Sequence, residues 1–291
     1  MKVIGFTFIR NAIKYDYPVE AAIRSILPLC DEVIVNVGNS DDATENLILE
    51  INPAKIKIFH STWDESLMEG GRVLAVETDK AYERIPADAD WCFYIQADEV
   101  IHEKYYDTIR SAMQKHKDDK SVEGLLFRYL HFYGSYDYVG DTRKWYSHEI
   151  RIIRKDDHIH SYRDAQGFRK EGRKLNVAEM DAYVYHYGWV RHPKYQMMKV
   201  LGFEKLYDNN FMAGKISKEE TEHFDYSAID SLTRFTGSHP GVMKQRISKK
   251  NWTFEHDISR KNFTLKGRIL HWIENVTGKR LFDYRNYNII K

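Results

Sequence analysis

Residues 91–101 read Trp-Cys-Phe-Tyr-Ile-Gln-Ala-Asp-Glu-Val-Ile, an apolar run typical of a buried strand that stops at two adjacent carboxylates, Asp98 and Glu99. In an open α/β sheet, ligands bind beyond the carboxyl ends of the strands. Acids at such a strand end are therefore placed to hold a metal or to contact a bound substrate. The alternative is that both acids cap a helix predicted over residues 102–115.

The composition excludes some classes of partner. The chain has 44 Lys and Arg against 43 Asp and Glu in 291 residues, so its net charge of +1 gives no reason to expect binding to nucleic acid. Cys30 and Cys92 both lie in or beside apolar runs, which predicts neither a disulfide framework nor a zinc site. The sequence starts with a short strand pattern and has no apolar run of about eighteen residues. We expect a cytoplasmic protein, with peripheral contact at the inner face of the membrane as an open alternative.

Strand and helix patterns alternate over the first hundred residues. Short apolar runs predict strands, and stretches with helical spacing lie between them. The predicted strands are residues 3–8, 31–37, 56–60 and 91–95, and the predicted helices are residues 17–29, 43–51 and 72–82. This order predicts an α/β fold with a mostly parallel, Rossmann-like central sheet flanked by helices, an architecture that commonly binds nucleotides.

The pattern changes from residue 124 onward. Additional strands are predicted at residues 125–132, 148–154 and 180–187. Beyond them the chain becomes polar and helical in texture, so we predict one domain at residues 1–190 and a mainly helical C-terminal region at residues 191–291, which would contact an acceptor or a membrane surface. Residues 265–291 mix apolar and basic side chains, which favours either an amphipathic helix on an anionic membrane or packing back on the first domain.

Three stretches of the chain carry a resemblance to a known family. They are Arg10-Asn11 after the first strand, Asp-Glu-Val-Ile-Val at residues 31–35 with Asn-Ser-Asp-Asp-Ala-Thr at residues 39–44, and Gln-Ala-Asp-Glu at residues 96–99. In their order and spacing they resemble the family-2 glycosyltransferases of the GT-A fold, which transfer a sugar from a nucleotide diphosphate to an acceptor. The resemblance covers about the first 190 residues. Two residues depart from the family pattern. Val37 stands where the family usually has the Asp that reads the nucleobase. Gln96 replaces the first Asp of the family's Asp-x-Asp motif.

The resemblance implies a metal site and a donor site. Asp98 is the implied ligand for Mn²⁺ or Mg²⁺, which prefer hard oxygen ligands, and His186 resembles a further ligand. Taken alone, His186 is equally well read as a hydrogen-bonded structural residue. The residues that we expect at the donor are Arg10, Asn11, Val37, Asp42, Arg72, Gln96 and Ala97.

Three of these donor-site residues have plainer alternatives. Asp42 would contact the nucleoside or cap the following helix, two roles that are compatible. Arg72 follows two glycines and would hold the diphosphate bidentately, or form an ordinary surface ion pair. Gln96 would bind the ribose or a metal-bound water, or simply end a strand.

An inverting transfer also needs a carboxylate that takes the proton from the acceptor hydroxyl. Asp164 lies in a loop where related enzymes often carry an acid, and Glu149 is the rival, unless it pairs with a nearby arginine. The resemblance thus implies a metal-dependent, inverting glycosyltransferase that serves a saccharide or lipid-linked acceptor in surface polysaccharide synthesis. A non-catalytic nucleotide- or carbohydrate-binding module of the same fold is the alternative that Val37 and Gln96 favour. A nucleotidyltransferase ranks lower, because residues 8–13 lack the glycines of a phosphate loop.

Overall fold

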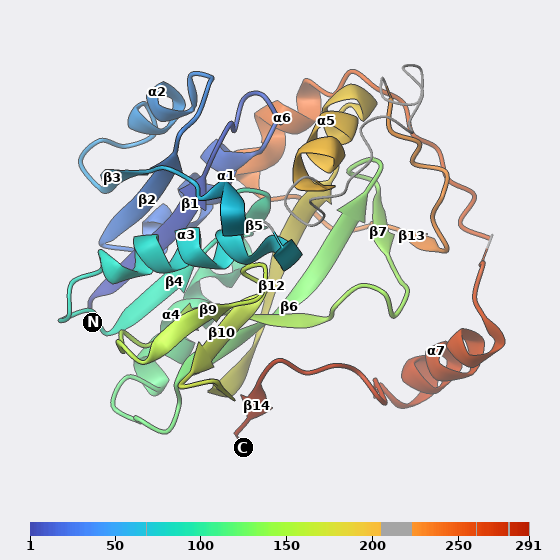
Figure 1. The fold of residues 1–291 in the computed structure, drawn as a ribbon. Coiled ribbons are helices and arrows are strands. Elements are labelled where there is room, and N and C mark those ends of the chain that lie inside the picture. Colours follow the sequence, from blue (N-terminus) through green and yellow to red (C-terminus); the bar gives the residue numbers. More distant parts are fainter. Residues whose placement is uncertain (68, 205–222, 260, 279, 291) are drawn as a thin grey trace.

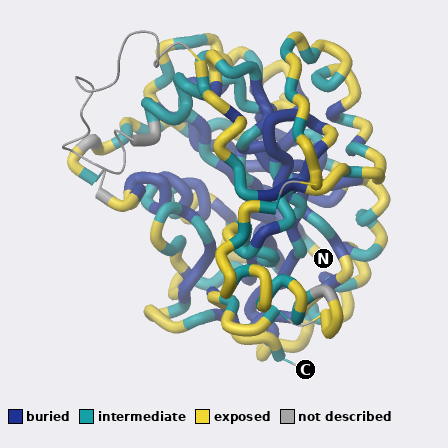
Figure 2. The backbone as a smooth tube through the Cα atoms, turned by 90° about the vertical axis from the view of Figure 1, so that its right-hand side faces the viewer, coloured by how far each residue is buried: buried dark blue, intermediate teal, exposed yellow. Residues whose placement is uncertain are grey.

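An eleven-stranded sheet runs through the computed structural model, with helices on both of its faces (Figure 1). The structure describes residues 1–291 except residues 68, 205–222, 260, 279 and 291. Buried backbone fills the middle of the molecule and exposed backbone forms its rim (Figure 2).

The N-terminal half of the sheet is parallel. Its four strands lie in the order β3-β2-β1-β4, with β1 central between β2 and β4. These strands are β1 (Val3–Ile9), β2 (Glu32–Gly38), β3 (Ile56–Ser61) and β4 (Trp91–Tyr94). The helices that connect or follow them are α1 (Val19–Ile26), α2 (Thr44–Leu49), α3 (Arg72–Glu83) and α4 (Tyr106–Lys115). The predicted α/β fold with a parallel core and flanking helices is confirmed.

Side-chain alternation along the strands builds a separate apolar core on each face of this sheet. In β2, Val33, Val35 and Val37 pack in the core that α1 and α4 cover. Ile34 points to the opposite face and packs with residues of α3. Asn36 shares that face, where its buried amide donates to the Glu77 carboxylate at 2.9 Å, so the polar group is satisfied.

The second half of the sheet mixes directions. Strand β8 (His148–Ile153) joins antiparallel to β4 and to β6 (Gly124–Tyr133). The long strand β12 (Asn176–Trp189) runs parallel to β6 and antiparallel to β5 (Glu99–Ile101). Because β5 follows directly after the end of β4, this pairing brings His186 of β12 opposite Glu99.

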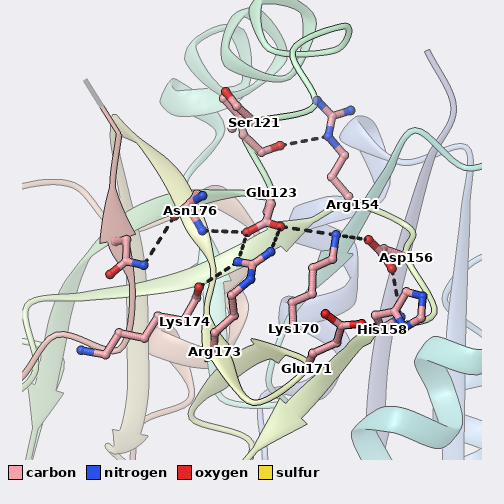
Figure 3. A network of polar contacts seen from close by, with 12 residues as sticks. Ser121, Glu123, Arg154, Asp156, His158, Lys170, Glu171, Arg173, Lys174 and Asn176 are labelled. Carbon is pink, nitrogen blue, oxygen red and sulfur yellow. Dashed lines mark hydrogen bonds and ion pairs between the residues drawn. The ribbon is translucent and has the colours of Figure 1, made fainter.

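A small three-stranded sheet packs beside the large one. It consists of β9 (Ile159–Tyr162), β10 (Gly167–Lys170) and β11 (Arg173–Lys174). Glu123, just before β6, accepts two hydrogen bonds from the Arg173 guanidinium, at 2.7 and 2.6 Å, and one from the backbone N of Asn176 at 3.0 Å (Figure 3). Lys170 bridges Glu123 and Asp156, and so ties the small sheet to the large one.

The C-terminal region returns to the sheet twice. Strand β13 (Leu232–Arg234) pairs with β7 (Tyr138–Gly140), and β14 (Asn288–Ile289) pairs with β12. Its helices are α5 (Pro193–Glu204), α6 (Lys244–Ser248) and α7 (Leu265–Thr277). Residues 223–259 and 261–264 are mostly irregular, and both the mainly helical character of residues 191–291 and the division near residue 190 stay predictions. Among the described helices, none is both long and apolar enough to cross a membrane.

Candidate functional site

A cleft of about 1030 Å³ opens beyond the carboxyl ends of β1 and β4. The segment after β1 contributes Arg10 and Asn11, and the turn after β4 contributes Gln96, Ala97 and Asp98. Rings line much of the remaining wall, contributed by Phe8, Tyr15, Tyr17, Trp63, Tyr146 and Trp189. The sequence therefore predicts correctly that this strand end opens into a cleft.

Asp98 lines this cleft and lies among three basic side chains. Lys199 Nζ donates a hydrogen bond to Asp98 Oδ2 at 3.0 Å, and the Arg191 guanidinium lies 3.9 Å from the same oxygen. On the other side, His186 Nε2 lies 3.7 Å from Asp98 Oδ1. Burial alone would raise the pKa of Asp98, but Lys199, His186 and Arg191 together hold it well below its usual range. Asp98 is therefore an ionised carboxylate in the folded protein.

Glu99 turns away from the cleft. Its carboxylate is fully buried, and Arg151 donates to it from Nε at 2.7 Å and from Nη2 at 2.8 Å. The Tyr129 hydroxyl and the backbone N of Gln96 donate to the same group at 2.7 and 3.1 Å. Glu99 thus closes the turn that presents Asp98. The alternative that both acids cap a helix is wrong, because His102 accepts the capping hydrogen bond there, from Lys104 N.

His186 is held by a second histidine that the sequence analysis missed. His131 Nδ1 lies 2.9 Å from His186 Nδ1, and His131 Nε2 lies 2.8 Å from the carbonyl oxygen of Tyr146. A carbonyl only accepts, so we assign the His131 proton to Nε2, and His131 Nδ1 then accepts from His186 Nδ1. Burial lowers the pKa of both rings, although Asp98 opposes the shift at His186. With its proton on Nδ1, a neutral His186 ring has its lone pair on Nε2, the atom that faces Asp98 Oδ1 at 3.7 Å.

Lys199 and Arg191 were also missed, because a helical lysine and a strand-end arginine have no motif of their own. Lys199 is a residue of α5, and its Nζ also donates to the Gly188 carbonyl at 3.0 Å. Burial lowers its pKa to about 8, although Asp98 opposes the shift. Arg191 is fully buried, donates to the Tyr15 carbonyl at 2.7 Å and stacks on Tyr17.

Asp164 also lines the cleft. It belongs to the turn between β9 and β10, in which Arg163 and Ala165 both adopt positive φ angles of 57° and 62°. Gln96 Nε2 donates to the Ala165 carbonyl at 3.2 Å, so the predicted donor residue Gln96 orders this turn. Asp164 also lines a second hollow of about 770 Å³, which it shares with Arg72.

Four predicted site residues do not reach the cleft. Val37 is 3% exposed and packs in the core below it. Asp42 accepts hydrogen bonds from Thr44, the first residue of α2, and from the backbone N of Lys14. The contacts to Thr44 agree with the alternative role at the start of the following helix. Arg72 is exposed at the start of α3 and lines only the second hollow.

Glu149, the fourth, is 2% exposed and lies beneath Gly167, where its Oε2 has no hydrogen-bond partner among the described residues. Burial raises its pKa to about 8. Among the described residues, Glu149 forms no ion pair with an arginine, since the nearby Arg151 pairs with Glu99 instead. A group buried under the loop is poorly placed to take a proton from an acceptor.

No protein-family model and no curated protein sequence matches this chain. Among solved structures, Staphylococcus aureus TarS 1-349 is 15% identical, with a TM-score of 0.40 over 71% of this chain and 65% of that one. The same TarS segment in complex with UDP gives 15% identity and a TM-score of 0.41, over 68% and 63%. Glucosyl-3-phosphoglycerate synthase from Mycobacterium tuberculosis, in complex with Mn²⁺, UDP and phosphoglyceric acid, is 16% identical with a TM-score of 0.29, over 45% and 43%. The chain spans less than two thirds of the length of each of these structures.

Proposed function

We propose that this protein transfers a sugar from a nucleotide-diphosphate donor to an acceptor hydroxyl. The observation that carries the proposal is the ionised Asp98 at the end of β4, which faces a cleft lined by rings and basic side chains. Aromatic rings suit stacking with a base or a sugar, and basic groups suit a diphosphate. The negative charge that develops on the leaving diphosphate would be met by the cations on this side of the cleft.

The pair formed by Asp98 and His186 suits a divalent metal ion. Asp98 Oδ1 and His186 Nε2 face one another at 3.7 Å, and when the His186 ring is neutral both are acceptor atoms, an arrangement that a cation between them would stabilise. Mg²⁺ binds oxygen at about 2.0–2.1 Å and often takes only one or two protein ligands beside phosphates and water. Within the described residues, no group of three His, Cys, Asp or Glu is placed to hold a metal, so the donor diphosphate would complete the coordination. Mn²⁺ or Mg²⁺ bound there would supply Lewis acidity at the diphosphate.

Asp164 would act as the base of an inverting transfer. Asp164 lines both the cleft and the second hollow, which would put it between a donor in the cleft and an acceptor beside it. A saccharide or lipid-linked acceptor, as in surface polysaccharide synthesis, would then enter from the side of that hollow. The carboxylate would take the hydroxyl proton as the acceptor oxygen attacks the anomeric carbon.

Donor turnover tests this proposal. The full chain is incubated with UDP-, GDP-, CDP- and dTDP-sugars, with and without Mn²⁺, and release of the nucleotide diphosphate is measured. We expect slow hydrolysis of one donor class that needs the metal. Asp98→Asn should lower the rate about 100-fold or more, as removal of a charge-stabilising group does. Asp88→Asn, a change at an exposed carboxylate paired with Lys2, is the matched control and should leave the rate unchanged.

A non-catalytic binding module is a second candidate, and one contact favours it. Lys199 Nζ already supplies a cation to Asp98, which lessens the charge available to a metal. Such a module would bind a nucleotide with no dependence on Mn²⁺ and would release no product from any donor. Binding without turnover across all four donor classes would therefore replace the transferase proposal with this one.

A further inference from the structure

Helix α7 carries a narrow apolar stripe that no part of the described chain covers. Leu265, Ile269, Trp272 and Val276 are 77%, 53%, 64% and 64% exposed. At about 100° per residue these four positions fall within an arc of about 60° on the helix surface. Single exposed apolar residues are common on proteins, but four aligned over three turns are not. The four residues therefore form one continuous apolar surface along the helix.

The opposite face of α7 holds the helix against the protein. Glu274, on that face, accepts a hydrogen bond from Arg143 at 2.9 Å. Arg280, just after the helix, donates to the Trp145 carbonyl at 2.6 Å. The helix ends are also defined, since the Thr264 hydroxyl accepts from Gly267 N and Gly278 takes the left-handed conformation that ends a helix. Figure 1 shows α7 at the edge of the molecule, in keeping with the exposure of the four stripe residues.

The charge around α7 indicates which kind of partner fits the apolar stripe. Residues 261–291 contain seven Lys and Arg against two Asp and Glu, whereas the whole chain has a net charge of +1. The rest of the chain is therefore net negative, and the segment that contains α7 is net positive. Lys266 and Arg268 are exposed and flank the stripe on either side. An anionic lipid surface matches both properties, because it accepts an apolar face and attracts the flanking cations.

We propose that α7 docks the protein on an anionic membrane surface, with its apolar stripe buried among the lipid headgroups and acyl chains. Trp272 would lie at the level of the headgroups, where tryptophan is favoured. Arg143 and Trp145, which hold α7, belong to the segment that also carries Tyr146, a residue of the cleft. Docking would thus bring the edge of the cleft toward the lipid. The inference rests on the surface of α7 alone and does not depend on the proposed activity.

Vesicle co-sedimentation of the full chain tests the proposal. Vesicles of phosphatidylcholine are compared with an equal mixture of phosphatidylcholine and phosphatidylglycerol, at low and high salt. We expect binding to the anionic vesicles that weakens at high salt. Ile269→Glu with Trp272→Glu should abolish it, and Lys266→Glu with Arg268→Glu should weaken it by at least about 25-fold, since each basic residue near an anionic surface is worth about fivefold in binding. Leu49→Glu, at a 47% exposed apolar residue of α2, is the matched control and should bind as the wild type does.

Two results would overturn the proposal. One is that the wild type fails to bind anionic vesicles, or that the Ile269 and Trp272 variant binds them equally well. The other is that light scattering finds a dimer that the same variant converts to a monomer, which would make a second copy the occupant of the stripe. Since all of these side chains are exposed, unchanged thermal unfolding should show that the variants fold. Donor hydrolysis without lipid should be unaffected by them, so the docking and the transferase proposals fail independently.

Discussion

The buried ion pair between Glu99 and Arg151 should be one of the most sensitive points in the fold. Their side chains are 0% and 1% exposed, and two hydrogen bonds of 2.7 and 2.8 Å join them. Replacing Arg151 by Met leaves the Glu99 carboxylate buried with only Tyr129 and a backbone N–H as donors. Removal of one partner from a buried pair costs about 3–5 kcal/mol, because the remaining charge stays desolvated. We expect Arg151→Met to lower the free energy of unfolding by this amount at neutral pH.

Urea denaturation followed by tryptophan fluorescence measures this loss. The double variant Glu99→Leu with Arg151→Met removes both charges, and should lose less stability than Arg151→Met alone. The difference in unfolding free energy between the single and the double variant separates the cost of an unpaired buried charge from the loss of contacts. A loss of less than about 1 kcal/mol for Arg151→Met, a value typical of exposed pairs, would refute the reasoning.

Three further changes have defined outcomes. Burial raises the pKa of Glu149 to about 8, so its contribution to stability is full below its ordinary value and is lost as pH rises through 8. Glu149→Gln should therefore flatten the fall in unfolding free energy between pH 5 and pH 9, and an unchanged slope in urea denaturation would contradict this. His131→Leu removes the partner that orients His186, and should weaken Mn²⁺ binding about 10- to 100-fold in calorimetry, with unchanged affinity as the opposing result. A Cβ at Gly188 would lie 2.5 Å from His186 Nε2, so Gly188→Ala should displace the imidazole and weaken Mn²⁺ binding in the same assay, whereas wild-type affinity would show that the ring is not a ligand.

Local patterns were sufficient to predict the parallel half of the sheet. Strand and helix periods alternate clearly from residue 3 to residue 95, and the four strands pair in parallel as that alternation requires. The same patterns locate Asp98 at a strand end that opens into the cleft. The resemblance points to His186, which on β12 lies 3.7 Å from Asp98, and its role as a metal ligand stays a prediction.

Strand register explains part of what the sequence did not predict. Val37 was assigned to the donor site by its place in a motif, but alternation along β2 directs its side chain into the core under α1. Asn36, its neighbour, points to the other face and bonds to Glu77 instead of a ligand. A motif alone therefore does not show which face of the strand its side chains take, and at Val37 that face is the core.

Contacts between residues far apart in the sequence explain why Lys199, His131 and the partner of Glu99 were not predicted. Lys199 is 101 residues from Asp98, and His131 is 55 residues from His186, so no local spacing links either pair. Asp98 and Glu99 are adjacent acids that the sequence does not distinguish. The partner of Glu99, Arg151, belongs to β8 and is 52 residues away. Only the assembled sheet shows which of the two acids faces the cleft and which one holds the turn.

Thermal unfolding against nucleotide diphosphates tests most directly whether Asp98 holds a metal-bound nucleotide. The wild type and Asp98→Asn are heated with UDP, GDP, CDP or dTDP, each with and without Mn²⁺. A ligand at a hundredfold excess over its Kd stabilises the folded state by about 2.7 kcal/mol. We expect one nucleotide to raise the Tm of the wild type further when Mn²⁺ is present, and this extra increment to vanish in Asp98→Asn. No response to any nucleotide, or the same Mn²⁺ increment in the variant, would contradict the account.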